Sequence, residues 1–361
     1  MAGGSIILSE VFELNGRGER LGLRPELTAS IARAAVTRLS HYPQRLYYHA
    51  NVFRRSSTGS QGGQQESYQA GVELLGASGS LADAEVLVIM ADCLQALGLK
   101  NWHLLLSEAG LTGALLAPFP AELQEQVKVA IATLDHVALE NLPLSDELSA
   151  LALTIMDLRG EPRTVLTKVS QLDLDAQQQR IVGELKNLVD LLESTLTHNP
   201  PKLVLDLSLI QTFDYYTGVV FEAVVRTEHT CEVVGQGGRY DNLLSLFHPE
   251  HSSYPGVGFV LNGESLQQIL QPHLPAGIAN SDWLVVPTTA AAAAAAINHA
   301  QTLRRTDTLT RVELSLDTTQ TKAALRQFAS DHKIANIAWV SEHDVLVERP
   351  TDRLTQASQQ P

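Results

Sequence analysis

The pattern of apolar and polar positions predicts a core built from strands and helices. Alternation of the two kinds of residue predicts strands over residues 5–15, 44–55 and 67–76. The last two strands are joined by the polar segment SSTGSQGGQQE, which predicts an antiparallel hairpin with a long loop. Helices are predicted from a first turn near Pro25 and over residues 81–97.

A different pattern runs from about residue 111 to residue 200, where Leu, Glu and Gln dominate. Apolar residues recur there on one helical stripe, formed by Ile181, Leu185, Leu188, Leu192 and Leu196. We therefore predict a helical insertion over about residues 111–200. A strand at 200–210 and a hairpin over 213–235 then return to the core, which we expect to cover residues 1–275.

Strand-like and helix-like segments alternate after Ser281, and this alternation predicts a small α/β domain over residues 281–350. Its alanine tract, 290–296, favours a helix because alanine is the best helix former. The polar residues 351–361 are expected to form a mobile tail.

The charge balance argues against nucleic acid as a partner. There are 26 basic and 40 acidic residues, which give a net charge of −14, whereas binding along nucleic acid normally needs a basic face. Five arginines do gather in one segment, and they are either solvated or available to an anion or an acidic partner: Arg33, Arg38, Arg45, Arg54 and Arg55.

The sequence shows no pattern of a membrane span, a signal peptide or a metal site. No apolar run reaches the roughly 20 residues that cross a bilayer, and the N-terminus does not have the pattern of a signal peptide, so we expect a cytoplasmic protein. Cys93 and Cys231 are expected to be buried free thiols. The 12 histidines show no metal-ligand spacing, and no metal site is predicted.

Several polar residues lie within apolar, strand-like segments. Gln69 and Glu73 are four residues apart on one predicted strand and therefore share a face. Glu26 opens a helix, and Asp214 precedes the run Val219, Val220, Phe221. Buried carboxylates need a polar ligand or a basic partner. One explanation is that these side chains face a polar ligand. The alternative is that Glu26 caps its own helix and Glu73 pairs with an arginine, and spacing alone does not decide between the two.

An ordered set of motifs resembles the histidyl-tRNA synthetases. The segments are LRPELTASIARA, PQRLYYHANVFRR, YQAGVELLG, DAEVLVIMADCLQALGL, FDYYTGVVFE, GGRYDNLL and PGVGFVLNGESL. The resemblance covers most of the first domain outside the helical insertion. It implies an α+β fold with the class II aminoacyl-tRNA synthetase-like antiparallel sheet flanked by helices, followed by an α/β domain similar to an anticodon-binding module.

The sequence departs from this family where the family does its chemistry. The resemblance implies an arginine before Asp-Tyr-Tyr, where this chain has Gln211, and an arginine after Glu264, where it has Ser265. The loop between the hairpin strands is nearly uncharged, although Arg54 keeps one anion-binding position. Loss of these cations argues against ATP-driven aminoacylation. We therefore predict no catalytic residues and no cofactor.

The positions that line the family's amino-acid pocket are retained. The resemblance implies a histidine-binding site formed by Glu26, Thr28, Gln69, Glu73, Tyr215, Tyr216, Arg239 and Tyr240. Carboxylates and a carboxamide can accept the N–H groups of histidine, and tyrosines can enclose its ring.

A histidine pocket without the activating residues is similar to that of the regulatory subunits of ATP phosphoribosyltransferase, which are paralogues of the synthetases. This resemblance implies a short-form catalytic subunit as partner, L-histidine as feedback ligand and self-association through the core. Members usually carry a further N-terminal segment, which is expected to be missing here. The alternatives are a divergent histidyl-tRNA synthetase and a structural paralogue that binds no amino acid.

Overall fold

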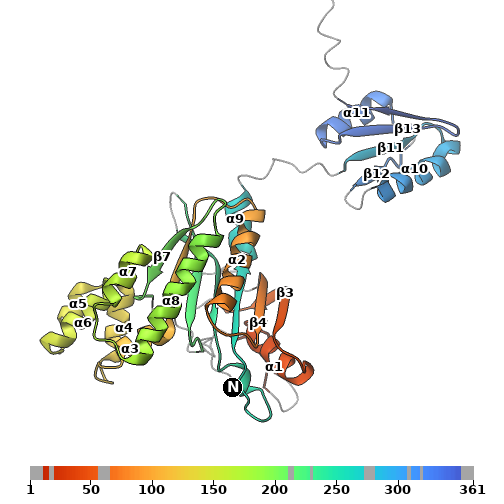
Figure 1. The fold of residues 1–361 in the computed structure, drawn as a ribbon. Helices are drawn as coiled ribbons and strands as arrows, with labels where there is room; N and C mark the ends of the chain where they lie inside the picture. Colours follow the sequence, from red (N-terminus) through yellow and green to blue (C-terminus); the bar gives the residue numbers. More distant parts are fainter. Residues whose placement is uncertain are drawn as a thin grey trace, which may run out of the picture. The chain divides into compact units, whose positions relative to one another are not determined.

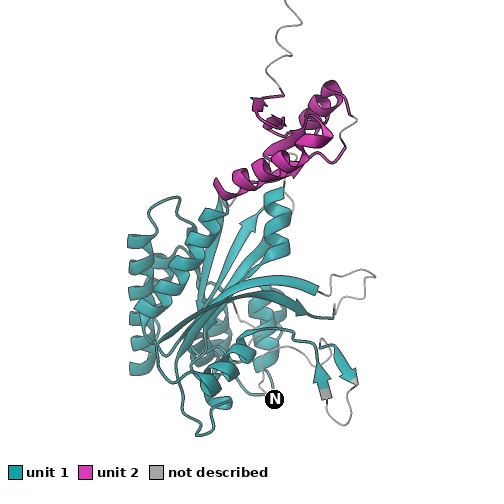
Figure 2. Ribbon diagram, turned by 90° about the vertical axis from the view of Figure 1, so that its right-hand side faces the viewer, with its two compact units in different colours: residues 1–272 teal, residues 273–361 magenta. Residues whose placement is uncertain are grey.

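A computed structural model of the chain describes residues 11–15, 20–55, 66–209, 215–227, 231–271, 281–306, 310–317 and 320–350. The chain divides into two compact units, residues 1–272 and 273–361 (Figure 2). Each unit is described by itself below.

An eight-stranded sheet forms the framework of the first unit, in the order β3-β4-β10-β9-β8-β5-β7-β6 (Figure 1). Neighbouring strands are antiparallel except for the parallel pair β5 and β7. The strands are β3 (Gln44–Phe53), β4 (Glu66–Leu75), β5 (Trp102–Glu108), β6 (Arg159–Gly160), β7 (Lys202–Asp206), β8 (Val219–Arg226), β9 (Cys231–Arg239) and β10 (Gly256–Asn262). The two predicted hairpins correspond to β3 with β4 and β8 with β9.

The N-terminal strand prediction over 5–15 is only partly testable, because residues 1–10 lie outside the described part. The described segment holds a three-residue strand, β1 (Glu13–Asn15), which pairs with β2 (Arg20–Gly22) in a separate two-stranded sheet. The polar loop 56–65, Gln211, Asp214 and the tail 351–361 also lie outside the described residues.

Helices cover the first unit's sheet on both faces. The helix α2 (Ser80–Ala96) packs against α8 (Ala176–Thr195), and both contribute buried residues to the largest apolar core. A smaller core on the other side contains Ala32 and Ala35 of α1 (Thr28–Arg38) together with Tyr240. The remaining helices are α3 (Ala109–Leu116), α4 (Gln124–Thr133), α5 (His136–Glu140), α6 (Asp146–Met156), α7 (Pro162–Val169) and α9 (Gly263–Leu270).

The predicted insertion is largely helical, and α3 to α8 gather beside β7 (Figure 1). Its longest helix, α8, begins at the capping box of Asp175, whose carboxylate accepts the backbone N–H groups of Gln177 and Gln178. On the predicted stripe, Leu185, Leu188 and Leu192 are buried, while the two end residues are half-buried.

The second unit is a four-stranded sheet in the order β12-β11-β13-β14, in agreement with the predicted α/β alternation. Its first three strands are parallel, and β14 is antiparallel to β13. The elements are β11 (Trp283–Pro287), α10 (Ala293–Thr306), β12 (Val312–Leu314), α11 (Lys322–Asp331), β13 (Asn336–Val340) and β14 (Val345–Glu348). The alanine tract forms a 3₁₀ turn and the start of α10.

One prediction about the thiols is wrong. Cys93 of α2 is half-buried, but Cys231 is exposed, because it is the first residue of β9 and pairs with Arg226, the last residue of β8. None of the described helices is long and apolar enough to cross a membrane.

Candidate functional site

A cavity of about 290 Å³ opens on the face of the sheet that carries α1. Seven of the eight residues predicted for the amino-acid pocket line it. These are Glu26, Thr28, Gln69, Glu73, Tyr215, Tyr216 and Tyr240. The sequence alone did not reveal that residues separated by more than 200 positions would meet at this point; β4, β9 and β10 bring them together by pairing side by side.

Glu73 is the most deeply buried polar group of the cavity, with 1% of its surface exposed. Its Oε1 accepts a hydrogen bond from the Thr28 hydroxyl at 2.9 Å, and its Oε2 accepts one from the Tyr240 hydroxyl. Burial raises the pKa of Glu73 to about 8, although the two hydroxyl donors oppose the shift. Among the described residues, the partners of Glu73 are these two hydroxyls, and none of the described ion pairs joins it to an arginine.

The strand opposite Glu73 is shaped to admit its carboxylate. Gly258 of β10 pairs with Glu73 of β4, and a Cβ at Gly258 would overlap Oε2 of Glu73. Gly238 has a similar role, because a Cβ there would lie 2.7 Å from the ring of Tyr216. Glycine at these two positions leaves room for the polar side chains of the cavity.

Glu26 has two roles. Both of its carboxylate oxygens lie 3.1 Å from the backbone nitrogen of Ala29, so it caps the first turn of α1 as one explanation had it. It also lines the cavity, where burial raises its pKa against the opposing effects of the Ala29 N–H and the Arg54 charge. Arg54 itself reaches the cavity wall and donates from Nε to the carbonyl oxygen of Pro25 at 2.8 Å.

Tyrosines form one wall of the cavity. The rings of Tyr215 and Tyr216 lie 4.7 Å apart, and Tyr215 meets Tyr240 edge to face at 6.1 Å. Burial raises the pKa of all three phenols, so they stay neutral and able to donate hydrogen bonds. An enclosed aromatic wall beside two carboxylates suits a small cationic or N–H-rich ligand that carries a flat ring.

Among the polar side chains that line the cavity, the structure adds two that the sequence did not single out. Tyr48 of β3 lines the cavity, and its ring lies so close over Gly71 that a Cβ there would overlap it. Gln236 of β9 lines it as well. Both residues lie on or beside strands that the sequence predicted. The face of the sheet on which each side chain lies depends on how those strands pair, which the sequence does not give.

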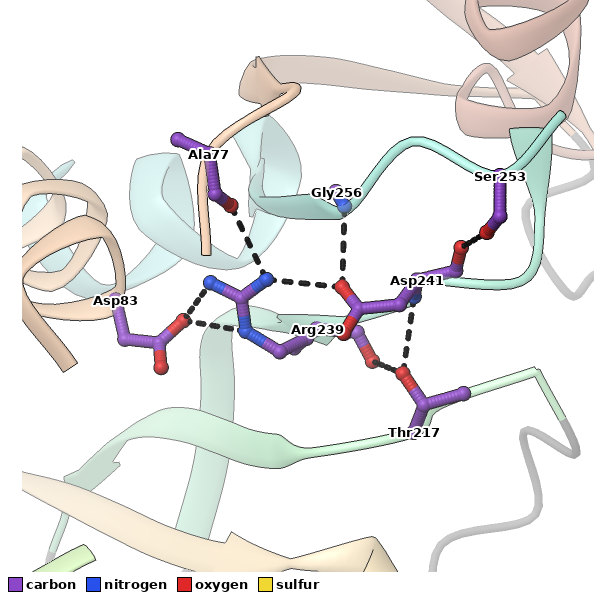
Figure 3. A network of polar contacts seen from close by, with 7 residues as sticks. All are labelled: Ala77, Asp83, Thr217, Arg239, Asp241, Ser253 and Gly256. Carbon is purple, nitrogen blue, oxygen red and sulfur yellow. Dashed lines mark hydrogen bonds and ion pairs between the residues drawn. The ribbon is translucent and has the colours of Figure 1, made fainter. Parts of the chain in front are cut away.

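The prediction that Arg239 contributes to the pocket is not supported by its position. Arg239 is the last residue of β9, and its side chain points to the opposite face of the sheet, where it binds Asp83 and Asp241 (Figure 3). Successive side chains of a strand point to opposite faces, and Arg239 directly precedes Tyr240, whose side chain reaches the cavity.

Ser265 is the one described position among those where the resemblance implied a catalytic arginine. It lies in the first turn of α9, beside Glu264, which accepts a hydrogen bond from the backbone N–H of Tyr68 at 2.6 Å. Among the described residues, no group of three or more His, Cys, Asp or Glu side chains is placed to hold a metal ion.

Comparison with known proteins addresses the family directly. Residues 3–266 match the family model of histidyl-tRNA synthetase. The ATP phosphoribosyltransferase regulatory subunit of Nostoc punctiforme is 55% identical over 345 residues, which are 94% of this chain and 85% of that protein. The protein of the same name from Picosynechococcus sp. is 50% identical over 94% of this chain and 85% of its own length. The chain belongs to the ATP phosphoribosyltransferase regulatory subunit family, within the histidyl-tRNA synthetase-like proteins.

Solved structures agree with this membership. The ATP phosphoribosyltransferase regulatory subunit/histidyl-tRNA synthetase of Bacillus halodurans is 26% identical, with a TM-score of 0.75 over 94% of this chain and 85% of that one. The histidyl-tRNA synthetase of Nostoc sp. PCC 7120 is 17% identical, with a TM-score of 0.77 over 94% of this chain and 81% of that one, and it shows the shared fold alone. The predicted class II synthetase-like fold is confirmed.

Proposed function

We propose that this member of the regulatory subunit family binds L-histidine in the cavity beside Glu73 and has no catalytic activity of its own. The observation that carries the proposal is the buried Glu73 carboxylate, held by Thr28 and Tyr240 at the closed end of an aromatic cavity. The α-ammonium or an imidazole N–H of histidine can be accepted by Glu73, Glu26 or Gln69. The tyrosine wall can enclose the ring.

In the same proposal, phosphoribosyl transfer belongs to a partner, a short-form ATP phosphoribosyltransferase catalytic subunit. This chain would then support the partner's activity and transmit inhibition by histidine in the first step of histidine biosynthesis. The name of the relatives supports a hetero-oligomer of this kind. Transmission of inhibition means that histidine and the partner have a coupling free energy, so each must change the other's affinity.

Titration calorimetry of the full chain with L-histidine tests the proposal. We expect selective binding that weakens about 10- to 100-fold in Glu73→Gln, because an ionic acceptor is replaced by a neutral one. Glu250→Gln, at an exposed carboxylate, is the matched control and should bind as the unaltered protein does. If the folded protein gives no heat with L-histidine, the proposed ligand is wrong.

The assembled enzyme provides the second measurement. Assembled with a short-form ATP phosphoribosyltransferase catalytic subunit, Glu73→Gln should still support phosphoribosyl transfer but should respond to histidine only at about 10- to 100-fold higher concentration. A structural paralogue that binds no amino acid would give the opposite pattern, with cavity variants as sensitive to histidine as the unaltered protein.

A divergent histidyl-tRNA synthetase is the second candidate, because the matched family model and the fold are shared with that enzyme. Aminoacylation requires positive charge on the triphosphate, and Ser265 cannot supply it. Histidine-dependent exchange of pyrophosphate into ATP decides between the two. Exchange above background at high protein concentration would favour the synthetase.

A further inference from the structure

Figure 3 shows an ion-pair network around Arg239, whose side chain lies on the face of the sheet opposite the cavity. At its centre is Arg239, which is 6% exposed. Its Nε and Nη2 donate to Oδ1 of Asp83 at 2.9 and 2.6 Å, and its Nη1 donates to Oδ1 of Asp241 at 2.9 Å. Nη1 also lies 3.2 Å from the carbonyl oxygen of Ala77. One side chain thus connects β9 to the start of α2 and to the segment after β4.

The network holds the backbone on both sides of Tyr240. The carbonyl oxygen of Arg239 accepts the Thr217 N–H at 2.8 Å, and the Asp241 N–H donates to the Thr217 hydroxyl at 2.9 Å. Oδ1 of Asp241 also accepts the Gly256 N–H at 3.2 Å. Tyr240 lies between two residues that are fixed from behind, and its own N–H donates to the Gly256 carbonyl at 2.7 Å.

The same network reaches the other tyrosines of the cavity wall. Thr217 immediately follows Tyr215 and Tyr216, so its bonds to Arg239 and Asp241 fix the end of the segment that carries both rings. Gly218 lies against the Arg239 side chain, since a Cβ at Gly218 would be 2.8 Å from Cδ of Arg239. The packing on the rear face and the tyrosine wall on the front face therefore share one support.

We propose that Arg239 is a positioning residue for the ligand cavity, which acts by holding Tyr240 where its hydroxyl meets Glu73. This inference rests on the proposed histidine site and assigns to Arg239 no contact with the ligand. A guanidinium is suited to the role because its planar fork binds Asp83 through two nitrogens and still has a third for Asp241, whereas the ammonium of lysine is a point charge.

A purely structural ion pair is the alternative, and a double-mutant cycle separates the two. In Arg239→Lys we expect L-histidine binding to weaken about tenfold, and in the Tyr240→Phe background we expect the same change to weaken it less than about twofold. The effects are non-additive because, in this proposal, Arg239 acts through the hydroxyl that Tyr240→Phe removes. Effects that simply multiply would overturn the proposal, as would binding by Arg239→Lys within about twofold of the unaltered protein.

Arg163→Lys is the matched control, because Arg163 also binds two acidic residues, Asp190 and Glu193, but does so on the surface of α7 and α8. It should leave histidine binding unchanged. Urea unfolding of each variant verifies that the protein is folded. If Arg239→Lys does not fold, Asp241→Asn replaces it in the same cycle, because the amide keeps an oxygen for Gly256 and removes only the charge.

A measurement without ligand keeps the inference separate from the proposed function. Tyr240 lowers the pKa of Glu73 by donating to it, so displacement of Tyr240 by Arg239→Lys should move the Glu73 titration to higher pH, as measured from stability against pH. In the Tyr240→Phe background, where this donor is already absent, Arg239→Lys should cause no further movement of the Glu73 titration. The other acidic side chains that line the network and the cavity are Asp83, Glu108, Glu184, Asp241 and Glu26. They are the same in both backgrounds, so their contributions cancel when the effect of Arg239→Lys on the profile is compared between the unaltered protein and Tyr240→Phe.

The outcomes are therefore distinct. If the unaltered protein does not bind L-histidine, the proposed function fails while the pH profiles still decide the role of Arg239. If histidine binds but Arg239→Lys changes the pH profile equally in the unaltered and the Tyr240→Phe backgrounds, or changes neither, the positioning role fails and the histidine site stands.

Discussion

Glu73 combines almost complete burial with hydrogen bonds only from neutral donors in the described structure, the hydroxyls of Thr28 and Tyr240. A carboxylate in such a place is costly when ionised, so the acid holds its proton up to a pKa of about 8. A ligand ammonium group would supply the missing positive charge and favour the ionised form. Ionisation of Glu73 in this buried place therefore lowers the stability of the folded protein.

The pH dependence of unfolding tests this state of Glu73. Its pKa is raised in the folded protein, so the folded state holds more protons than the unfolded state between about pH 5 and 8, and Glu73 makes stability fall as the pH rises through that window. We expect Glu73→Gln to reduce the fall, because an amide does not titrate. The fall in stability is measured from urea unfolding midpoints at about pH 6, 7 and 8. Parallel profiles for the two proteins would show that Glu73 is ionised when folded.

Other buried acids contribute to the same slope and set its background. Burial raises the pKa of Glu108 to about 7, and it also raises the pKa of Glu26 and Asp83. The comparison of two proteins that differ only at residue 73 removes these contributions.

At the scale of elements, strand pairing determines which side chains the cavity can hold. Pairing of β4 with β10 places Glu73 beside Gly258, and any side chain at Gly258 would overlap both the carboxylate and the backbone of β4. The alternation along β9 sends Gln236 and Arg239 to opposite faces, so one strand serves the cavity and the network behind it.

Substitution of glycine by alanine at two positions tests this arrangement. Gly258→Ala should destabilise the protein by about 1–3 kcal/mol through overpacking and should weaken histidine binding, because Glu73 must move. Gly183→Ala is the matched change in α8, where a Cβ meets nothing within 4 Å. It should stabilise by up to about 1 kcal/mol through helix propensity and leave binding unchanged. Urea unfolding and calorimetry measure both quantities, and tight histidine binding by Gly258→Ala would contradict the proposed role of Glu73.

At the scale of the whole molecule, the two units have separate apolar cores. The buried residues of the first unit's cores all lie at or before Leu266, and those of the second unit's cores all lie at or after Leu284. The ligand cavity lies wholly within the first unit. Ligand binding should therefore stabilise the first unit by mass action without a direct effect on the second.

Thermal unfolding with L-histidine tests this separation. At a ligand concentration of 100 times Kd, the first unit should gain about 2.7 kcal/mol and unfold at higher temperature. In a Trp102→Phe variant the remaining tryptophans, Trp283 and Trp339, both belong to the second unit, so fluorescence reports that unit alone. We expect its transition to stay in place while the far-ultraviolet circular dichroism transition of the first unit rises. A joint shift would show that the two units unfold together.

The sequence by itself determined the family, the fold class and most of the elements of this protein. The hydrophobic pattern indicated the hairpins, the helical insertion and the α/β unit, because strand and helix periods are local properties. The ordered motifs indicated the family, and seven of the eight predicted pocket residues line the cavity. Gln211 and the uncharged loop, which also argue against catalysis, lie outside the described residues and remain sequence arguments.

Only the tertiary structure decided on which side of the sheet each group lies. Tyr215 and Tyr216 are neighbours, yet both line the cavity. They precede β8, so their side chains do not have to point to opposite faces of the sheet as successive residues of a strand do. Arg239 and Tyr240 are neighbours at the end of β9, and they point to opposite faces. Side-chain direction depends on where a strand ends and which strands pair with it. Those features arise from long-range contacts, and no short motif contains them.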